Sequence, residues 1–139
     1  MTDRLTPEQR SSVMRSVRQK DTAPERTVRS KIHAMGFRFR LHVRTLPGNP
    51  DIVLPRHRKI ILVHGCFWHQ HPGCRKATIP QSNREFWQKK LERNRSRDRQ
   101  VLHDLIAEGW SILVVWECQL RDGKNLEDRL RRFLYDEHR

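Results

Sequence analysis

Residues 52–63 read IVLPRHRKIILV, and this stretch decides the fold class. It contains two short runs rich in β-branched residues, Ile52–Leu54 and Lys59–Val63, on either side of the turn Pro55–Arg58. Two such runs separated by a short turn predict a β-hairpin. The hairpin supplies two strands of the expected sheet, and the elements on either side of it build on them.

Upstream of the hairpin, the sequence predicts two helices and one more strand. The first helix begins at Thr6, and the second begins at the capping box Thr22–Glu25 and ends near Gly36. Residues 37–41 alternate between apolar and basic side chains, which is the period of a strand. Turn residues follow at positions 46–50.

Downstream, residues 64–84 hold His, Cys, Pro and Gly and are expected to be irregular. A long helix is predicted over Arg84–Glu108, a strand over Ser111–Trp116 and a closing helix over Leu126–Tyr135. Helices that connect strands predict an α/β protein with a mixed sheet flanked by helices, in a single domain over residues 1–139. The buried side of the long helix is expected to hold Trp87, Leu91, Val101, Leu102, Leu105 and Ile106.

The composition indicates a polyanionic partner. The 139 residues include 29 Lys and Arg against 16 Asp and Glu, which gives a formal net charge of +13. The basic residues are spread along the chain without a polybasic tail, which favours nucleic acid over a membrane surface or a purely solubilising charge. No apolar stretch approaches the ~20 residues of a membrane span, and the N-terminal residues lack the apolar core of a signal peptide. A cytoplasmic protein without a membrane partner is therefore expected.

Three cysteines and one histidine are the residue types of a structural zinc site. Cys66, His71 and Cys74 share one short segment, and Cys118 follows the predicted strand 111–116. Three thiolates and one imidazole form a common closed, tetrahedral zinc site. Short Cys/His spacing in an intracellular chain favours a metal over disulfides. The alternative is that Cys118 is a buried apolar residue and that the other three are incidental.

Asp51 and two histidines have the chemistry of phosphodiester hydrolysis. Asp51 opens the first strand of the hairpin and His64 ends the second, and a carboxylate is the type of ligand that Mg²⁺ prefers. A neutral histidine, His64 or His69, can accept a proton from water near pH 7. The alternatives are that Asp51 belongs only to a turn and that the histidines are structural or bind zinc.

Two further acids and a set of aromatic residues have open roles. Glu25 and Asp98 can orient a histidine or hold a metal-bound water; alternatively, Glu25 only completes its capping box and Asp98 only neutralises its neighbouring arginines. Phe67 and Trp68 lie within the Cys/His segment, and EFW begins the long helix at residues 85–87. Large flat side chains beside basic residues can wedge into a base stack, with ordinary core packing as the alternative.

Several motifs resemble the very short patch repair (Vsr) DNA mismatch endonucleases. The most distinctive is HGCFWHQH at residues 64–71, and EFW at residues 85–87 and VWEC at residues 115–118 also match. DTAPE at residues 21–25 and LPGNPD at residues 46–51 match as well. RSSVM at residues 10–14 also matches, so the resemblance runs from the first predicted helix to the last strand.

The resemblance implies a restriction-endonuclease-like fold with a structural zinc and a hydrolase that acts on DNA. Enzymes of this family nick the strand that carries the thymine of a T:G mismatch, on its 5′ side and with Mg²⁺, after deamination of 5-methylcytosine. The implied partners are double-stranded DNA with a T:G mismatch and mismatch-repair proteins, in the bacterial cytoplasm at the nucleoid. Residues 1–20 would form a DNA-contacting helix, and residues 21–139 would form the catalytic core.

The family's functional residues correspond to matching positions of this chain. Asp51 and the backbone carbonyl of Val63 would bind Mg²⁺, and the family commonly has threonine in place of this valine. His69 would be the general base and His64 would assist at the scissile phosphate, with the reverse assignment as the alternative. The remaining residues would be supporting acids (Glu25 and Asp98), zinc ligands (Cys66, His71, Cys74 and Cys118) and side chains that insert into DNA (Met14, Phe67, Trp68 and Trp87).

Two rival functions share part of this pattern. A non-catalytic, zinc-stabilised DNA-binding protein explains the charge and the cysteines but leaves Asp51, His64 and His69 without a role. A related restriction-like or structure-selective nuclease would share the catalytic residues and differ in specificity. For the mismatch nuclease a monomer is expected, because a mismatch lacks two-fold symmetry and only one strand should be cut.

Overall fold

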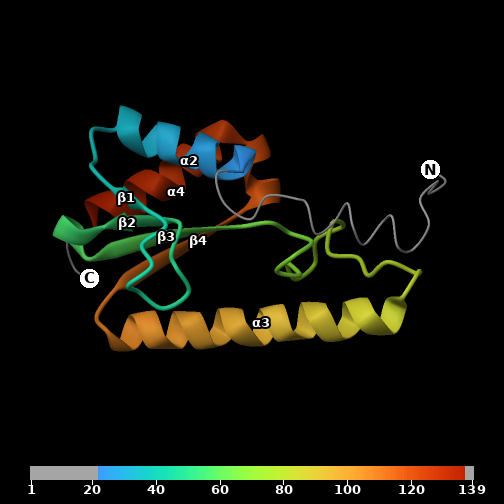
Figure 1. Ribbon diagram of the computed structural model, residues 1–139. Helices are drawn as coiled ribbons and strands as arrows, with labels where there is room; N and C mark the ends of the chain where they lie inside the picture. The colour runs from blue at the N-terminus through green and yellow to red at the C-terminus, as the bar shows by residue number, and fades with distance from the viewer. Residues whose placement is uncertain (1–21, 137–139) are drawn as a thin grey trace.

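A four-stranded sheet in the order β1-β2-β3-β4 lies at the centre of the protein, as the computed structural model shows (Figure 1). The structure describes residues 22–136. β1, β2 and β3 are antiparallel neighbours, whereas β3 and β4 are parallel, so the expected mixed sheet is confirmed. The strands are β1 (Arg40–Leu41), β2 (Ile52–Leu54), β3 (Lys59–His64) and β4 (Ser111–Trp116).

The hairpin of β2 and β3 lies where the sequence predicts it. Ile52 pairs with Ile61, and the connection is one turn of 3₁₀-helix, Pro55–His57, followed by Arg58 in the left-handed conformation with φ 56°. Every residue of β2 and β3 is buried. The two strands are almost entirely apolar because helices cover both faces of the sheet.

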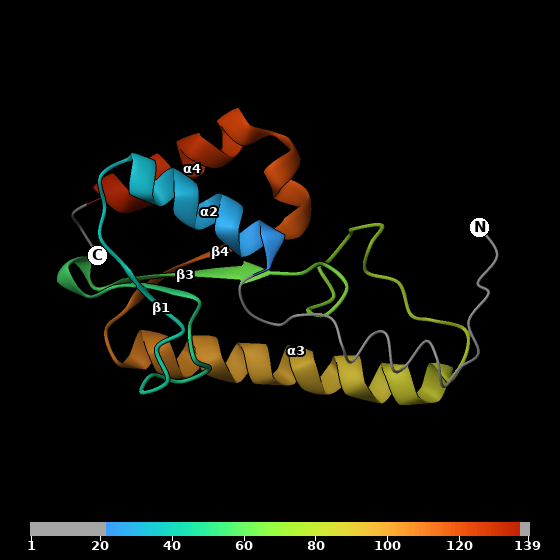
Figure 2. The same ribbon diagram turned by 45° about the horizontal axis from the view of Figure 1, so that its top comes forward.

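The helices form two layers, one on each face of the sheet (Figures 1 and 2). α2 (Ala23–Ala34) and α4 (Gly123–Tyr135) lie on one face, and α3 (Arg84–Ala107) lies on the other. α3 also forms the crossover that the parallel pair of β3 and β4 requires. The expected α/β architecture is therefore present in the described residues.

Two hydrophobic cores lie between these layers, and β3 contributes to both. Ile61 and Val63 belong to the core under α2 and α4, whereas Ile60 and Leu62 belong to the core above α3. This alternation is the two-residue period of a strand. The first core also contains Val28, Ile32, Ile52, Leu54, Val115, Leu126, Leu130 and Leu134, and the second also contains Val53, Leu105 and Trp110.

The strand expected over residues 37–41 is shorter than predicted. Only Arg40–Leu41 pairs with β2, because His42 takes a left-handed conformation (φ 48°) and ends the strand. Phe37 and Phe39 pack against the core under α2 and α4 without joining the sheet. β1 is therefore a short edge strand.

The other predicted boundaries are close to the observed ones. Thr22 caps α2, since its Oγ1 accepts the N–H of Glu25 at 3.3 Å, and Gly109 follows α3 with φ 91°. The prediction that Ile106 is buried is wrong: it is 61% exposed, because it lies about 100° around the helix axis from buried Leu105. The first predicted helix lies outside the described residues. Within them, no helix combines the length and the apolar character needed to cross a membrane.

Lys59 connects the start of β3 to the end of α4. It is 3% exposed, and its Nζ donates to the backbone carbonyls of Phe133 at 2.6 Å, Leu134 at 3.0 Å and Asp136 at 2.5 Å. The last carbonyls of a helix lack partners within the helix, and a cation there is favourable. The buried lysine therefore caps α4 and holds it on the sheet.

Replacing Lys59 with Met should lower the free energy of unfolding by about 1–3 kcal/mol, because the carbonyls at the end of α4 would lose a charged donor. Urea denaturation of the two proteins measures this difference. Lys89→Met is the matched control: its side chain is 66% exposed. The control should change stability by less than about 0.5 kcal/mol. Equal losses in the two variants would contradict the capping role.

Candidate active site

The titratable residues that the sequence singles out gather at one edge of the sheet. His64 ends β3, Trp116 ends β4 beside it in the parallel register, and Cys118 lies in the next turn. Asp51 comes just before β2, which runs in the opposite direction and therefore begins at the same edge. The loop 65–83 follows β3 and lies over the N-terminal half of α3 (Figure 1). Distant parts of the chain thus meet here.

The four predicted zinc ligands lie together. The ligand atoms of Cys66, His71, Cys74 and Cys118 are all within 4.8 Å of one another. His71 Nδ1 lies 3.4 Å from Cys118 Sγ and 3.8 Å from Cys66 Sγ. Burial raises the pKa of the Cys66 thiol to about 12, so a cation must replace its proton before it can act as a thiolate ligand. Three sulfurs and one imidazole at this spacing fit a zinc ion.

Trp116 lies between this cluster and a pair of histidines. Its indole stacks on His71, with ring centroids 4.2 Å apart and planes inclined by 11°. It meets His64 edge-on at 5.1 Å, and His64 in turn stacks on His69 at 3.9 Å. Sequence reasoning missed Trp116 as part of the site. The available signal was the register of the parallel strands, which pairs Trp116 with His64.

The two candidate bases have different surroundings. His69 Nδ1 lies 2.7 Å from Oδ2 of Asp98 on α3, so Asp98, and not Glu25, is the acid that orients this ring. His64 is 8% exposed. Burial, followed by the charge of His69, lowers the pKa of His64 to about 4, although Asp98 opposes this shift. His64 is therefore neutral near pH 7.

A third group of titratable residues surrounds Asp51. Its Oδ2 accepts the backbone N–H of Val63 at 2.9 Å. Burial raises the pKa of the Asp51 carboxyl, although this hydrogen bond and the nearby histidines act in the opposite direction. The ligand atoms of Glu25, His42 and Asp51 lie within 4.8 Å of one another. Two carboxylates and one imidazole are a donor set that fits a divalent cation, and the two carboxylates are the type of ligand that Mg²⁺ takes.

Sequence reasoning missed His42 and gave Glu25 only a general supporting role. Glu25 is 3% exposed on the first turn of α2, and its Oε2 lies 3.6 Å from His42 Nε2. The His42 N–H donates to the backbone carbonyl of Asp51 at 3.1 Å. The available signal was the antiparallel pairing of Arg40 with Val53, which continues to place residue 42 opposite residue 51.

The aromatic residues divide into a partly exposed pair and a buried support. Phe67 and Trp68 are half-buried, with ring centroids 5.1 Å apart, and Trp87 lies 5.8 Å and 6.0 Å from them, respectively. Trp87 is 1% exposed, which confirms its predicted place on the buried side of α3; it supports these rings, in contrast to the implied role in DNA insertion. Phe86, the preceding residue of α3, is 52% exposed. Met14 lies outside the described residues.

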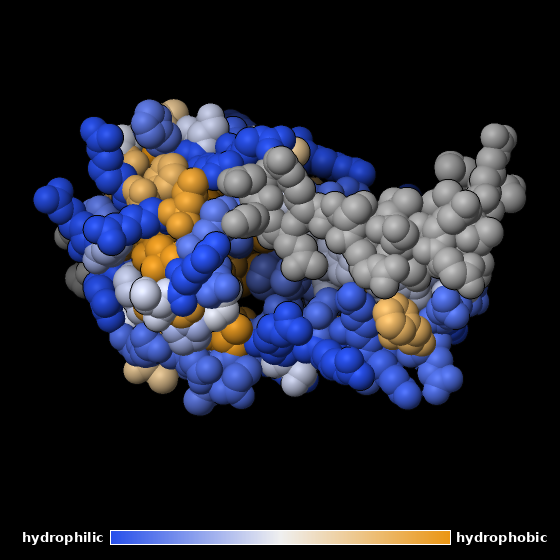
Figure 3. All heavy atoms as spheres, in the orientation of Figure 1, coloured by the Kyte–Doolittle hydropathy of each residue, from blue (hydrophilic) through white to orange (hydrophobic). Residues whose placement is uncertain are grey.

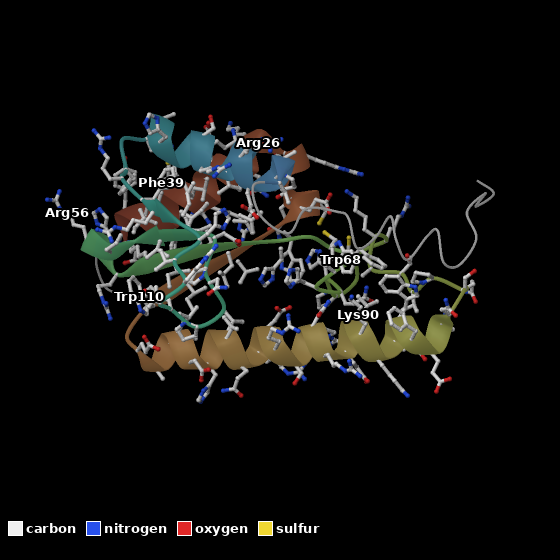
Figure 4. The ribbon with its side chains drawn as sticks, viewed as in Figure 1. Arg26, Phe39, Arg56, Trp68, Lys90 and Trp110 are labelled. Atoms are coloured by element: carbon white, nitrogen blue, oxygen red, sulfur yellow. The ribbon has the colours of Figure 1, made fainter. Side chains whose placement is uncertain are left out.

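The surface around Trp68 combines cations with flat apolar rings. Lys90 Nζ lies 5.9 Å from the Trp68 ring, and Figure 4 shows both side chains at the end of the molecule away from Arg56 and Trp110. Asn94 Nδ2 donates to the Trp68 carbonyl at 3.2 Å and attaches the loop to α3. In the space-filling view most of the described surface is hydrophilic; the larger hydrophobic area lies at the end of the molecule that holds β1 and β2, and a smaller patch lies near the N-terminal end of α3 (Figure 3).

Comparison with known proteins identifies relatives over nearly the whole chain. A family model described as DNA mismatch endonuclease Vsr matches residues 2–76. The type II nicking enzyme V.XorIIP of Xanthomonas oryzae pv. oryzae is 53% identical over 134 residues, which cover 96% of this chain and 98% of the relative. The DNA mismatch endonuclease Vsr of Escherichia coli (strain K12) is 41% identical over 119 residues, which cover 86% of this chain and 76% of the relative.

The low pKa of His64 predicts a loss of stability in mild acid. The unfolded chain protonates His64 near pH 6.5 and the folded chain near pH 4, so the unfolded state binds more protons between these values. The contribution is present above pH 6.5 and is lost as the pH falls toward 4, by up to about 3 kcal/mol. Denaturant unfolding of wild type and His64→Gln across this range measures it.

The difference between the two proteins isolates His64, because protonation of the cysteine cluster affects both. The stability of His64→Gln should vary less with pH than that of wild type. His103→Gln should follow the wild-type curve, since that side chain is 78% exposed. Parallel curves for wild type and His64→Gln would show that His64 is not held as a neutral buried ring.

Proposed function

Because the chain belongs to the Vsr DNA mismatch endonuclease family, we propose that it nicks DNA on the 5′ side of the thymine in T:G mismatches created by 5-methylcytosine deamination. The chain is a DNA endonuclease, as the names of its relatives indicate. The observation that most directly supports the proposed reaction is the 2.7 Å contact between His69 and Asp98 beside His64. A nick at this position would initiate very short patch repair.

His69 is the proposed general base. When its Nδ1–H donates to Asp98, Nε2 is the ring atom that accepts a proton from the attacking water. The Asp98 carboxylate fixes the tautomer and orientation of the ring, and it stabilises the positive charge that the ring acquires. The stack on His64 holds the plane of the ring. One histidine and one acid thus provide the proton transfer.

His64 is proposed to act as a neutral hydrogen-bond donor at the scissile phosphate. Its pKa of about 4 leaves it uncharged at pH 7, with one ring N–H to donate. A charged His64, stacked 3.9 Å from His69, would oppose the positive charge that His69 gains from water. The burial of His64 therefore favours proton transfer to its neighbour.

Asp51 and the backbone carbonyl of Val63 are the proposed Mg²⁺ ligands, and Glu25 lies close to Asp51. Mg²⁺, when bound, would neutralise the negative charge that develops on the phosphate. The hydrogen bond from the Val63 N–H to Asp51 holds the end of β3 and the carboxylate together. Because the proposed ligand is a main-chain atom, valine can serve where the family commonly has threonine.

A structural zinc is proposed at the Cys/His cluster. Its four ligands enclose the part of the loop that carries Trp68 and His69, since these residues lie between Cys66 and His71. Zinc binding to such a segment contributes directly to its folding. The proposed ion would therefore position both His69, the proposed base, and Trp68, which is proposed to insert into DNA. A restriction-endonuclease-like fold of the sheet is part of the same proposal.

Double-stranded DNA with a T:G mismatch is the proposed substrate. The net charge of +13 supports binding to the phosphate backbone. Phe67 and Trp68 are proposed to enter the base stack from one groove and Met14 from the other, because apolar wedges unstack base steps and a mismatched pair is the least costly to open. A monomer that acts at the nucleoid in the bacterial cytoplasm, together with mismatch-repair proteins, completes the proposal.

One duplex prepared in three forms tests this function. With C:G, T:A or T:G at a single position and Mg²⁺ present, only the T:G duplex should be nicked, on the thymine strand. A denaturing gel with each strand labelled separately reports the site and the strand. Equal cutting of all three forms would indicate a nuclease of different specificity, and binding without cutting would indicate a DNA-binding protein.

The same assay separates the roles of the two histidines. His69→Ala should bind the T:G duplex normally and nick it about 10²–10⁴-fold more slowly. Asp98→Asn should show a smaller defect in the same direction, because the ring remains but loses the carboxylate that orients it. If His64→Ala removes the pH dependence of the nicking rate while His69→Ala keeps it, His64 is the base and the two histidines exchange roles.

Cys118→Ala should yield a zinc-depleted and poorly folded protein, because it removes one of four ligands and the one outside the loop. Elemental analysis measures bound zinc, and circular dichroism measures the loss of structure. A wild-type protein purified without zinc would contradict the assignment, as would a fully folded Cys118→Ala variant.

Trp68 and Trp87 form a matched pair for the proposed DNA wedge. Trp87→Ala should lose about 3–5 kcal/mol of stability, because this ring is 1% exposed. Trp68→Ala should leave the melting temperature nearly unchanged and weaken binding to the T:G duplex relative to the T:A duplex. A large loss of stability in Trp68→Ala would instead make this ring a core residue.

A further inference from the structure

We propose that His42 is a third ligand of the cation bound at Asp51 and Glu25, and that its imidazole makes this site favour Mn²⁺ over Mg²⁺. The inference rests on the proposed function, since it adds a ligand to the same cation site. The ligand atoms of the three residues lie within 4.8 Å of one another. These residues come from α2, from the position after β1 and from the position before β2, so tertiary structure brings them together.

The backbone of His42 holds its ring at this position. His42 has φ 48°, a left-handed conformation that costs free energy in any residue with a side chain and that histidine adopts more often than most. Its N–H donates to the backbone carbonyl of Asp51 at 3.1 Å, one residue beyond the last pair of β1 and β2. The conformation that ends the strand is thus fixed by Asp51 itself.

The spacing fits two ligands of one ion better than a direct hydrogen bond. His42 Nε2 and Glu25 Oε2 are 3.6 Å apart, whereas a hydrogen bond between nitrogen and oxygen spans about 2.7–3.2 Å. Ligands at about 2.1 Å from an octahedral ion lie about 3.0 Å apart when adjacent and about 4.2 Å apart when opposite. The observed separations therefore need only small side-chain movements to close around a cation.

Burial and charge also favour a shared cation. The side chains of Glu25 and His42 are 5% and 20% exposed, and burial raises the pKa of Asp51. A divalent cation beside both carboxylates would offset the cost of burying their negative charge. A divalent ion held by both carboxylates would leave the His42 imidazole to complete the set of ligands.

The type of the third ligand determines which ion the site prefers. Mg²⁺ takes oxygen ligands and retains its waters, whereas an imidazole nitrogen adds affinity for first-row transition ions. An all-oxygen site at Glu25 and Asp51 would give Mn²⁺ little advantage. With His42 as a ligand, Mn²⁺ gains a bond to nitrogen that Mg²⁺ forms poorly. Mn²⁺ is therefore the ion used in the test.

Pulsed electron paramagnetic resonance of the full-length protein with Mn²⁺ alone tests the proposal. A directly bound imidazole gives a ¹⁴N coupling, which wild type should show. His42→Gln should lose this coupling and bind Mn²⁺ at least about tenfold more weakly, while its affinity for Mg²⁺, measured by competition, should change by less than about twofold. Thermal unfolding and zinc content should match wild type, and His42→Asn provides a second variant if His42→Gln does not fold.

Two control variants identify the source of the nitrogen signal. His69→Ala should retain the ¹⁴N coupling, because His69 is engaged with Asp98. Asp51→Asn should lose Mn²⁺ binding at this site. If the coupling disappears in His69→Ala and persists in His42→Gln, the nitrogen ligand is His69 and the proposal is overturned.

The outcomes also distinguish this proposal from the proposed function. Mn²⁺ binding that depends on Asp51 but shows no ¹⁴N coupling would overturn the role of His42 and leave the cation site intact. Mn²⁺ binding that does not respond to Asp51→Asn would overturn the cation site, and with it both proposals.

Discussion

The enclosure of β3 is the constraint on which the rest of the structure depends. This strand pairs with β2 on one edge and with β4 on the other, and helices cover both of its faces. A slip of one residue would exchange the two cores that Ile60 and Ile61 enter, so the register is strongly determined. The same strand holds Lys59 against α4 at one end and presents His64 at the other. The geometry of the site is therefore fixed by the packing of the core.

The same packing buries ionisable groups of the site, which raises the free energy of their charged forms. A chain with a net charge of +13 should favour ionised carboxylates, yet the pKa of Asp51 is raised. Local burial thus outweighs the attraction of the surrounding charge, as expected when nearby charges are solvated and screened. The same burial keeps His64 neutral and Cys66 protonated. Ionisable residues at these buried positions give the protein a lower free energy of unfolding than apolar residues would give. Such a cost is common where a site requires particular charges.

Features that depend on local spacing or on residue type could be predicted from the sequence. Features that depend on the exact helical phase or on strand register were predicted less accurately. The Thr22 cap, the hairpin and the four-residue Cys/His set are of the first kind. Ile106 shows the second: it follows buried Leu105 but is exposed, because one residue turns the helix by about 100°. His42 and Trp116 escaped notice because only the pairing of strands brings them to Asp51 and His64. Asp98 and Glu25 were equivalent candidates until the fold separated them.

The parallel pairing of β3 and β4 has a consequence for the order of events on the ribosome. Asp98 lies on the crossover helix and Cys118 follows β4, so a nascent chain that has already exposed β3 still lacks both. β4 cannot dock until the whole of α3 has emerged, because parallel neighbours need a long connection. The pair of His69 and Asp98 and the cysteine cluster are thus completed only after α3 and β4 have emerged. A product that ends within α3 lacks both β4 and Cys118, so it cannot bring the four residues of the Cys/His cluster together.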